Sequence, residues 1–146
     1  MCFTLYVGAS IKLPLIEWNK EQPGFHTANP RDYELRVLSR FTLPHVLYVG
    51  SHEGCGCGFR HALAEGKNWL PVVEDDKDTL NAIQKNHVDL RQYLAGNTAA
   101  RSFEIYACWN SDVNDCPDCV SDIKIEDIVK EDFYFKEGWL YRVATW

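Results

Sequence analysis

Four cysteines of the chain stand in two close pairs, and this spacing is typical of metal ligands. Cys55 and Cys57 lie in the glycine-rich stretch 50–58, and Cys116 and Cys119 flank a Pro-Asp dipeptide. Two thiolates separated by one or two residues can face one ion, and glycine lets the backbone turn so that both sulfurs point inward. Four such ligands match tetrahedral Zn²⁺. We therefore predict that the two pairs share one structural zinc ion.

Three further residues are candidates to replace one of these sulfurs. His52 and His61 flank the first pair, and Cys108 precedes the second pair by eight positions. Isolated histidines on loops are more often ordinary surface residues than ligands. Cys2 and Cys108 fall on expected strands, where a free cysteine packs as a small hydrophobe. We expect both to lie in the core.

Two other functions remain open from the same residues. The stretch 50–58 follows an apolar run, so its backbone N–H groups could form an anion site with Cys55 or Cys57 as the nucleophile of a thiol-dependent enzyme. Alternatively, the cysteines are purely structural and an aromatic patch makes the chain a protein-interaction module. The partner, a small molecule or a protein, is unknown in each case.

The second cysteine pair also carries a short resemblance. The four residues Cys116-Pro117-Asp118-Cys119 resemble the active-site motif of glutaredoxin-type oxidoreductases, and this resemblance implies thiol redox chemistry. In those enzymes the motif follows the first strand and begins a long helix, whereas here it lies late in the chain. Asp115 and Asp122 lie nearby, and carboxylates raise the pKa of a thiol that attack requires to be low. The same negative charge favours a bound cation.

The expected elements follow from hydrophobic periodicity. Residues 79–95 carry apolar side chains at spacings of three and four, with Asp78 before them and Gly96 after them, which predicts an amphipathic helix. His87 falls on the apolar face of this helix, and we expect it to be buried and hydrogen-bonded to backbone. Strands are predicted over 2–7, 45–49 and 102–109 from apolar and alternating patterns.

The shared zinc site depends on the direction of two strands. A strand, helix and strand over 45–49, 79–95 and 102–109 usually form a parallel crossover. The loops after both strands then lie at the same edge of the sheet, where the two cysteine pairs can meet. Antiparallel strands would separate these loops by roughly 17–20 Å, the length of a strand.

The whole chain, residues 1–146, is expected to be one globular domain with an α+β or α/β fold. Its length suits a single hydrophobic core, and neither a repeat nor a low-complexity linker divides it. We predict a central mixed β-sheet, the helix 79–95, a helix within 29–41 and a C-terminal β-hairpin over 133–143, with Gly138 in its turn.

Charge and hydropathy argue against two classes of partner. The chain carries 15 Lys and Arg against 21 Asp and Glu, and its basic residues are scattered, so we expect neither a nucleic acid nor a membrane as a partner. No apolar run approaches the ~20 residues that a membrane helix needs, and the first residues lack the features of a secretory signal. We expect a cytoplasmic protein, where thiols stay reduced and six cysteines favour metal binding, catalysis or packing over disulfides.

Overall fold

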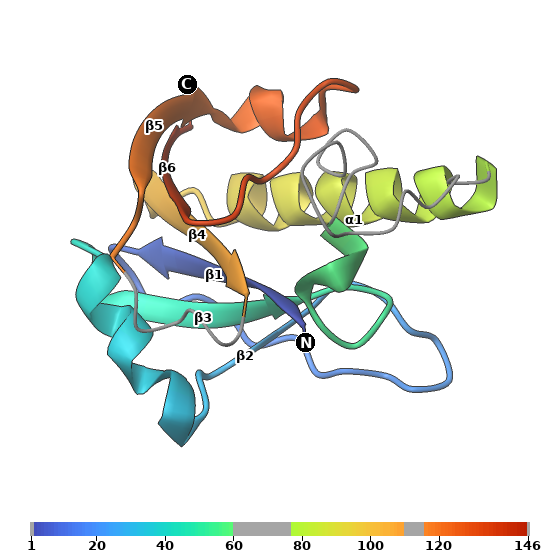
Figure 1. Ribbon diagram of the computed structural model, residues 1–146, viewed down its shortest axis with the longest axis horizontal. Helices are drawn as coiled ribbons and strands as arrows, with labels where there is room; N and C mark the ends of the chain where they lie inside the picture. Colours follow the sequence, from blue (N-terminus) through green and yellow to red (C-terminus); the bar gives the residue numbers. More distant parts are fainter. Residues whose placement is uncertain (1, 60–76, 110–115, 146) are drawn as a thin grey trace.

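A mixed β-sheet forms the centre of the molecule (Figure 1). The computed structural model describes residues 2–59, 77–109 and 116–145. Within these ranges the sheet has six strands in the order β2-β3-β1-β4-β6-β5, of which only β5 and β6 pair in parallel. The strands are β1 (Phe3–Ala9), β2 (His26–Ala28), β3 (His45–Gly50), β4 (Ser102–Trp109), β5 (Cys119–Lys124) and β6 (Trp139–Ala144).

One α-helix and three 3₁₀ helices accompany the sheet in the same ranges. They are η1 (Asp32–Arg40), η2 (Gly56–Phe59), α1 (Lys77–Gly96) and η5 (Ile125–Val129). The predicted helix 79–95 is confirmed as α1, and the predicted strands correspond to β1, β3 and β4. The single-domain α+β fold is therefore confirmed. The predicted residues His61 and Asp115 lie outside the described part of the chain.

Strand β1 lies in the interior of the sheet and pairs antiparallel with both β3 and β4. All seven of its residues are buried, as expected for an apolar strand covered on both faces. Because β3 and β4 both run opposite to β1, they point in the same direction. The prediction that the loops after these strands leave the same edge of the sheet is confirmed, although β1 lies between the two strands.

The two faces of the sheet pack against different helices. On one face, side chains of β1, β4 and β6 pack against Leu90, Tyr93 and Leu94 of α1 in the larger core cluster. On the other face, a smaller cluster joins Tyr6 and Tyr106 of the sheet to Val37 of η1. Strand β4 is consequently buried at every position after Ser102, although its sequence alternates.

The predicted helix within 29–41 exists, but it is the 3₁₀ helix η1 and begins at Asp32. Asn29 and Pro30 precede this helix and do not cap it. The carboxylate of Glu34 accepts a hydrogen bond from the backbone N–H of Arg31 at 2.7 Å and so closes the first turn. Glu34 also accepts a hydrogen bond from the hydroxyl of buried Tyr6, at 2.9 Å, which anchors η1 to the sheet.

The C-terminal hairpin turns at residues 136–138, where Gly138 has a φ of +77°. Its outgoing arm is β6, while Phe133–Phe135 is not assigned to a strand. The two arms contact through aromatic rings, because the ring of Tyr141 lies 5.9 Å from that of Phe133 and 5.5 Å from that of Phe135.

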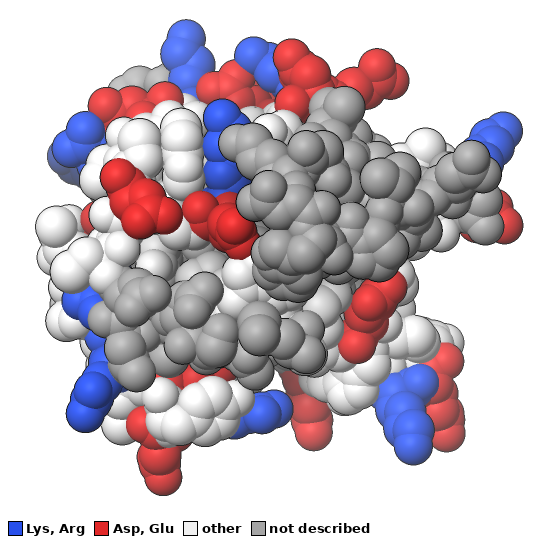
Figure 2. All heavy atoms as spheres, viewed as in Figure 1, with Lys and Arg blue, Asp and Glu red and all other residues white. Residues whose placement is uncertain are grey.

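Acidic and basic side chains are interspersed over the face shown in Figure 2. This distribution accompanies a formal net charge of -6. Of the helices in the described ranges, none is both long and apolar enough to cross a membrane.

Candidate metal centre

Three cysteines, Cys2, Cys55 and Cys57, form a cluster at one edge of the sheet. Their sulfur atoms all lie within 4.8 Å of one another, and each residue is partly buried. Sulfurs bound to one tetrahedral zinc ion lie about 3.8 Å apart, since each Zn–S bond is about 2.3 Å long. A small contraction of the cluster would therefore place all three sulfurs on one ion. The chain thus has a cysteine cluster that could hold a metal ion.

The antiparallel pairing of β1 with β3 brings these cysteines together. Leu5 of β1 lies opposite Val49 of β3, so the start of β1 is beside the end of β3. Cys2 immediately precedes β1, and the loop that follows β3 carries Cys55 and Cys57. Figure 1 shows the N-terminal end of β1 and η2 close together.

Ser51 organises the loop that carries the cysteine pair. Its side chain is fully buried, and its hydroxyl donates to the carbonyl of Cys55 at 2.6 Å. The hydroxyl oxygen of Ser51 also accepts hydrogen bonds from the backbone N–H groups of Glu53 and Gly58, at 3.2 and 3.0 Å. A single side chain therefore holds the loop on both sides of the cysteine pair.

Glycine at position 56 lets this loop lie directly against β1. A Cβ atom at Gly56 would lie 2.6 Å from the carbonyl oxygen of Phe3, which belongs to the backbone and cannot rotate away. Gly54, with a φ of +81°, makes the preceding turn. The glycines predicted to aim the cysteine sulfurs inward thus have a second role in close packing.

Helix α1 fixes the loop from the other side through Asn86. The side-chain nitrogen of this buried residue lies 2.7 Å from Nδ1 of His52 and donates to the carbonyl of Gly58 at 3.1 Å. The Nε2 atom of His52 lies 3.8 Å from the carboxylate of Glu53. His52, a candidate substitute ligand, is thus held by Asn86 and is not a member of the cysteine cluster.

Hydrogen bonds concentrate negative charge on one sulfur of the cluster. The thiol of Cys55, the backbone N–H of Phe3 at 3.4 Å and the thiol of Cys2 together lower the pKa of Cys57 to about 6, against the opposing effects of burial and Glu53. The same contact with Cys57, together with burial, raises the pKa of Cys55. The first proton of the pair is therefore lost readily and the thiolate resides on Cys57.

The other predicted ligands, Cys116 and Cys119, are not members of this cluster. Cys119 begins β5, and the register across β6 and β4 places it three strands from Leu5 of β1, or about 14 Å away. Cys116 is exposed and lines a small pocket of about 120 Å³ with Cys108 and Trp109. Of the two predicted pairs, only the first belongs to the cluster.

Cys108 and Cys2 were both predicted to lie in the core, but only Cys108 does so. Cys108 is buried, as expected, and its sulfur lies 3.3 Å from the hydroxyl of Thr4. Cys2, also expected in the core, is partly exposed and completes the cluster instead. The sequence places Cys2 at the start of β1, which could have pointed to the cluster. However, the pairing of β1 with β3, which brings Cys2 beside the cysteine loop, becomes visible only in the fold.

His87, on the apolar face of α1, is buried, as predicted. The Nδ1 atom of His87 lies 2.8 Å from the carbonyl oxygen of Ile128, and its ring stacks on that of Phe135 with centroids 5.4 Å apart. This histidine joins α1 to η5 and the C-terminal hairpin and is not part of the cysteine cluster.

A pocket of about 590 Å³ adjoins the cysteine loop at Gly54. The rings of Trp18, His26 and Tyr48 line it, and the ring centroids of Trp18 and His26 are 4.7 Å apart. A Cβ atom at Gly50 would lie 2.0 Å from Nε2 of His26, so the glycine provides the space that this ring occupies. Burial, and to a smaller extent Cys55, raise the pKa of Tyr48.

No protein-family model matches the chain, and no curated protein or solved structure is significantly similar to it. The function is therefore inferred from the geometry of the site.

Proposed function

We propose that the protein binds one zinc ion through the sulfurs of Cys2, Cys55 and Cys57. The observation that carries this proposal is the convergence of three thiols, from two distant parts of the sequence, to within 4.8 Å of one another. Thiolates are soft ligands that favour Zn²⁺ and Cu⁺ over Mg²⁺ or Ca²⁺. Zinc is the proposed ion because it is the common partner of cysteine-rich sites and needs no redox change.

The electrostatics of the cluster support metal binding. A thiol must lose its proton before it binds a metal, and the pKa of about 6 at Cys57 means that one ligand is already a thiolate near neutral pH. Once a divalent cation is bound there, its charge favours deprotonation of Cys55 and Cys2 as well. Binding is therefore expected to begin at Cys57.

Preorganisation of the loop is the second support. Ser51 and Asn86 hold the backbone on both sides of the cysteine pair, and the carbonyl of Phe3 limits how far the loop can move. A loop fixed in this way loses little conformational entropy on binding an ion.

Three protein ligands leave one position of a tetrahedral ion open. In the described part of the chain no further His, Cys, Asp or Glu joins the cluster. Zinc sites with three protein ligands and an exchangeable fourth ligand are typical of reactive centres, whereas purely structural sites are filled by four residues. The proposed zinc therefore ties β1 to the loop after β3 and also offers a position for solvent or a small ligand.

Elemental analysis of protein purified without added metal or chelator tests the proposal. We expect about one zinc per chain in the wild type and a loss of at least ~90% of it in C57S, because removal of one of three thiolates eliminates a principal ligand. C2S and C55S should lower the zinc content similarly. The matched control is C116S, which alters an exposed cysteine outside the cluster and should keep its metal.

Two results would contradict this assignment. Zinc retained in both C2S and C57S would mean that the metal binds elsewhere, and wild-type protein that takes up no Zn²⁺ even when titrated with it would exclude the site. Substitution by Co²⁺ adds an independent check, because thiolate-to-cobalt charge-transfer bands should appear in the wild type and C116S but not in C57S.

A thiol-dependent activity at Cys57 is the second candidate, and the hydrogen bond from the N–H of Phe3 to its sulfur favours it. This contact stabilises a thiolate nucleophile, and a pocket lined in part by Gly54 adjoins the loop that carries Cys57. Such an activity uses the same sulfur as the zinc site, so the two functions compete.

Alkylation with iodoacetamide separates the two candidates. If zinc occupies the cluster, the protein as purified should protect all three thiols until a chelator is added. If Cys57 is a free nucleophile, the rate should be unaffected by chelator and one thiol should react much faster than the others. Peptide mapping of the modified residues identifies that thiol.

We also propose that the protein resides in a reducing compartment such as the cytoplasm. All six cysteines are free thiols, including the three whose sulfur atoms lie within 4.8 Å of one another. Neighbouring thiols oxidise readily in secretory compartments, so their function as ligands requires a reducing environment. A cell fractionation experiment with an epitope-tagged chain would check this expectation.

A further inference from the structure

One buried carboxylate is only half satisfied. Glu104 of β4 is 3% exposed, and its Oε1 atom accepts three hydrogen bonds: from the N–H groups of Thr42 and Leu43, both at 2.9 Å, and from the hydroxyl of Thr42 at 3.0 Å. Its Oε2 atom is buried and has no hydrogen-bond partner among the described residues. An unsatisfied buried polar atom of this kind is costly and calls for an explanation.

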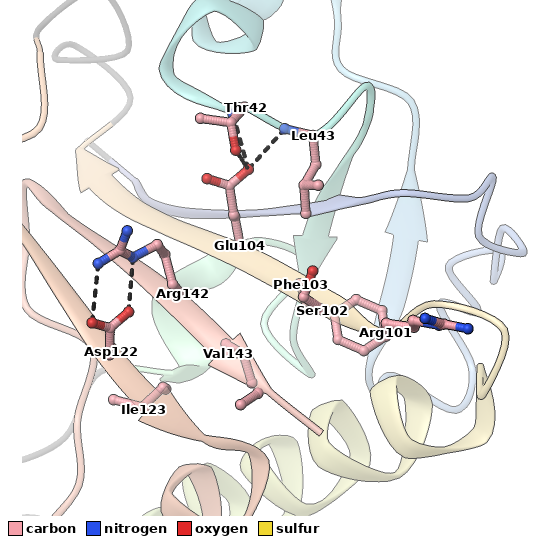
Figure 3. A pocket seen from close by; sticks show the side chains of 11 residues that line it. Thr42, Leu43, Arg101, Ser102, Phe103, Glu104, Asp122, Ile123, Arg142 and Val143 are labelled. Carbon is pink, nitrogen blue, oxygen red and sulfur yellow. Dashed lines mark hydrogen bonds and ion pairs between the residues drawn. The ribbon is translucent and has the colours of Figure 1, made fainter. Parts of the chain in front are cut away.

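This carboxylate lines a pocket of about 590 Å³ (Figure 3). In Figure 3 one oxygen of Glu104 meets Thr42 and Leu43, and the other is turned to the side on which Arg142 and Asp122 lie. The pocket volume falls in the range of small-molecule sites. Phe103, Ile123 and Val143 also border the pocket, but their side chains belong to the larger core cluster or pack against it, so the apolar side chains on the face of Glu104 are those of Leu43 and Ala144.

The charged side chains beside Glu104 pair with each other and not with its Oε2 atom. Glu104, Arg142 and Asp122 lie side by side on β4, β6 and β5, in register with one another. The guanidinium of Arg142 is engaged by both oxygens of Asp122, with its Nε at 2.7 Å from one and an Nη at 3.0 Å from the other. The positive charge closest in register is therefore already paired, while Oε2 of Glu104 still lacks a donor.

We propose that this pocket binds a small organic cation, with a primary ammonium or guanidinium head on Oε2 of Glu104 and a short alkyl stem on the apolar lining. A charged N–H donor compensates a buried carboxylate better than a neutral one does. The stem gains contact with Leu43 and Ala144. This site is independent of the proposed zinc site, because Gly8, which pairs with Glu104, lies about 17 Å along β1 from Phe3.

Access to the buried oxygen requires one side chain to move. Arg142 lies directly opposite Glu104 and is 60% exposed, so it can rotate towards solvent without loss of core packing. Its ion pair with Asp122 is exposed to solvent on both sides, and exposed ion pairs of this kind are weak. Displacement of Arg142 by a ligand head is therefore inexpensive compared with the hydrogen bond that Glu104 gains.

NMR titration of the full chain with n-butylammonium tests the proposal, with the amides of Thr42 and Leu43 as reporters because both donate to Glu104. Saturable shifts of these two amides are expected with n-butylammonium and with butylguanidinium. The neutral probe n-butanol, at matched ionic strength, should leave them unchanged. E104Q keeps an oxygen acceptor for Thr42 and Leu43 but loses the charge, and should weaken cation binding by about tenfold or more.

R142Q removes the side chain that must move and should increase cation affinity, whereas E126Q, which alters an exposed carboxylate that does not line the pocket, is the matched control and should leave the affinity unchanged. Equal shifts with n-butanol, undiminished affinity in E104Q, or no saturable shift in the wild type at high millimolar cation would each overturn the proposal. So would a side-chain NMR contact showing that Arg142 itself pairs with Glu104 in the free protein. Thermal unfolding of E104Q confirms that the variant is folded before its affinity is interpreted.

Discussion

At the scale of single residues, the contact between Gly56 and Phe3 determines how close the cysteine loop can come to β1. The space for a Cβ atom is absent, because the obstacle is a backbone oxygen 2.6 Å away. In G56A the loop must move outward, and the sulfur of Cys57 should lose its hydrogen bond from the N–H of Phe3. We expect a loss of about 1–3 kcal/mol in unfolding free energy and weaker zinc binding.

Urea unfolding and zinc competition with a chromogenic chelator measure these two effects. The control is G24A, since a Cβ atom at Gly24 meets nothing within 4 Å. Unchanged stability and zinc affinity in G56A would show that the loop does not depend on its contact with β1.

Residue-level inference from the sequence was strongest where chemistry is local. The pair Cys55 and Cys57 could be identified as candidate ligands because both lie in one glycine-rich loop. Cys2 could not, because its place in the cluster depends on the pairing of β1 with β3, more than forty residues away. Glu104 gave no signal either, since its partners Thr42 and Leu43 approach it only in the folded chain.

At the scale of elements, α1 acts as a support for the cysteine loop as well as a cover for the sheet. Asn86 lies on the buried face of the helix among apolar residues and hydrogen-bonds to both His52 and Gly58. N86A should leave these groups unsatisfied and destabilise the protein by about 1–3 kcal/mol. N81A, at an exposed position of the same helix, has the same change in helix propensity and serves as the control.

Native-state hydrogen exchange of N86A measures which part of the molecule Asn86 stabilises. In N86A, amides of the loop after β3 should exchange faster, while those in the centre of α1 retain their protection. Uniformly faster exchange along the helix would indicate that Asn86 supports α1 itself and not the loop.

Elements were predicted well where periodicity alone determines them and less well where tertiary contacts decide. The 3.6-residue period of α1 and the apolar runs of β1 and β3 identified these segments. The form of η1 depends on the hydrogen bonds of Glu34 to Arg31 and Tyr6, which its sequence pattern does not reveal. The separation of Cys119 from Cys55 likewise follows from β6 lying between β4 and β5.

At the scale of the whole molecule, a bound metal would join the start of β1 to the loop that follows β3. Removal of zinc with a chelator should lower the thermal midpoint of the wild type, and the shift should grow with the free zinc concentration used for comparison. C57S should unfold at the same temperature with and without chelator. A wild-type midpoint unaffected by chelator would contradict a stabilising metal.

Buried tyrosines predict the response of the fold to alkali. Burial raises the pKa of Tyr141 to about 12, and burial also raises the pKa of Tyr6, Tyr48 and Tyr93. The unfolded value is about 10, so the neutral phenols contribute stability that is fully present below pH ~10 and is lost as the pH rises towards about 12. Unfolding free energy should therefore fall steeply in this window.

The variant Y141F should show a shallower dependence of unfolding free energy on pH between about 10 and 12, because it removes one raised phenol. Ultraviolet titration of phenolate should show these tyrosines ionising together with unfolding. If the wild type and Y141F had identical slopes, the hydroxyl of Tyr141 would have to titrate normally in the folded state.

Because β1 lies between β3 and β4, it can complete its pairing only after both of these strands have been synthesised. This strand emerges first during synthesis, yet its two neighbours comprise residues 45–50 and 102–109. The edge of β1 that pairs with β4 stays open until residues 102–109 have been synthesised, which slows assembly and leaves an apolar strand prone to aggregation. The Cys2, Cys55 and Cys57 cluster forms with the first of these pairings, so metal capture could secure a half-built sheet while β4 is still being made.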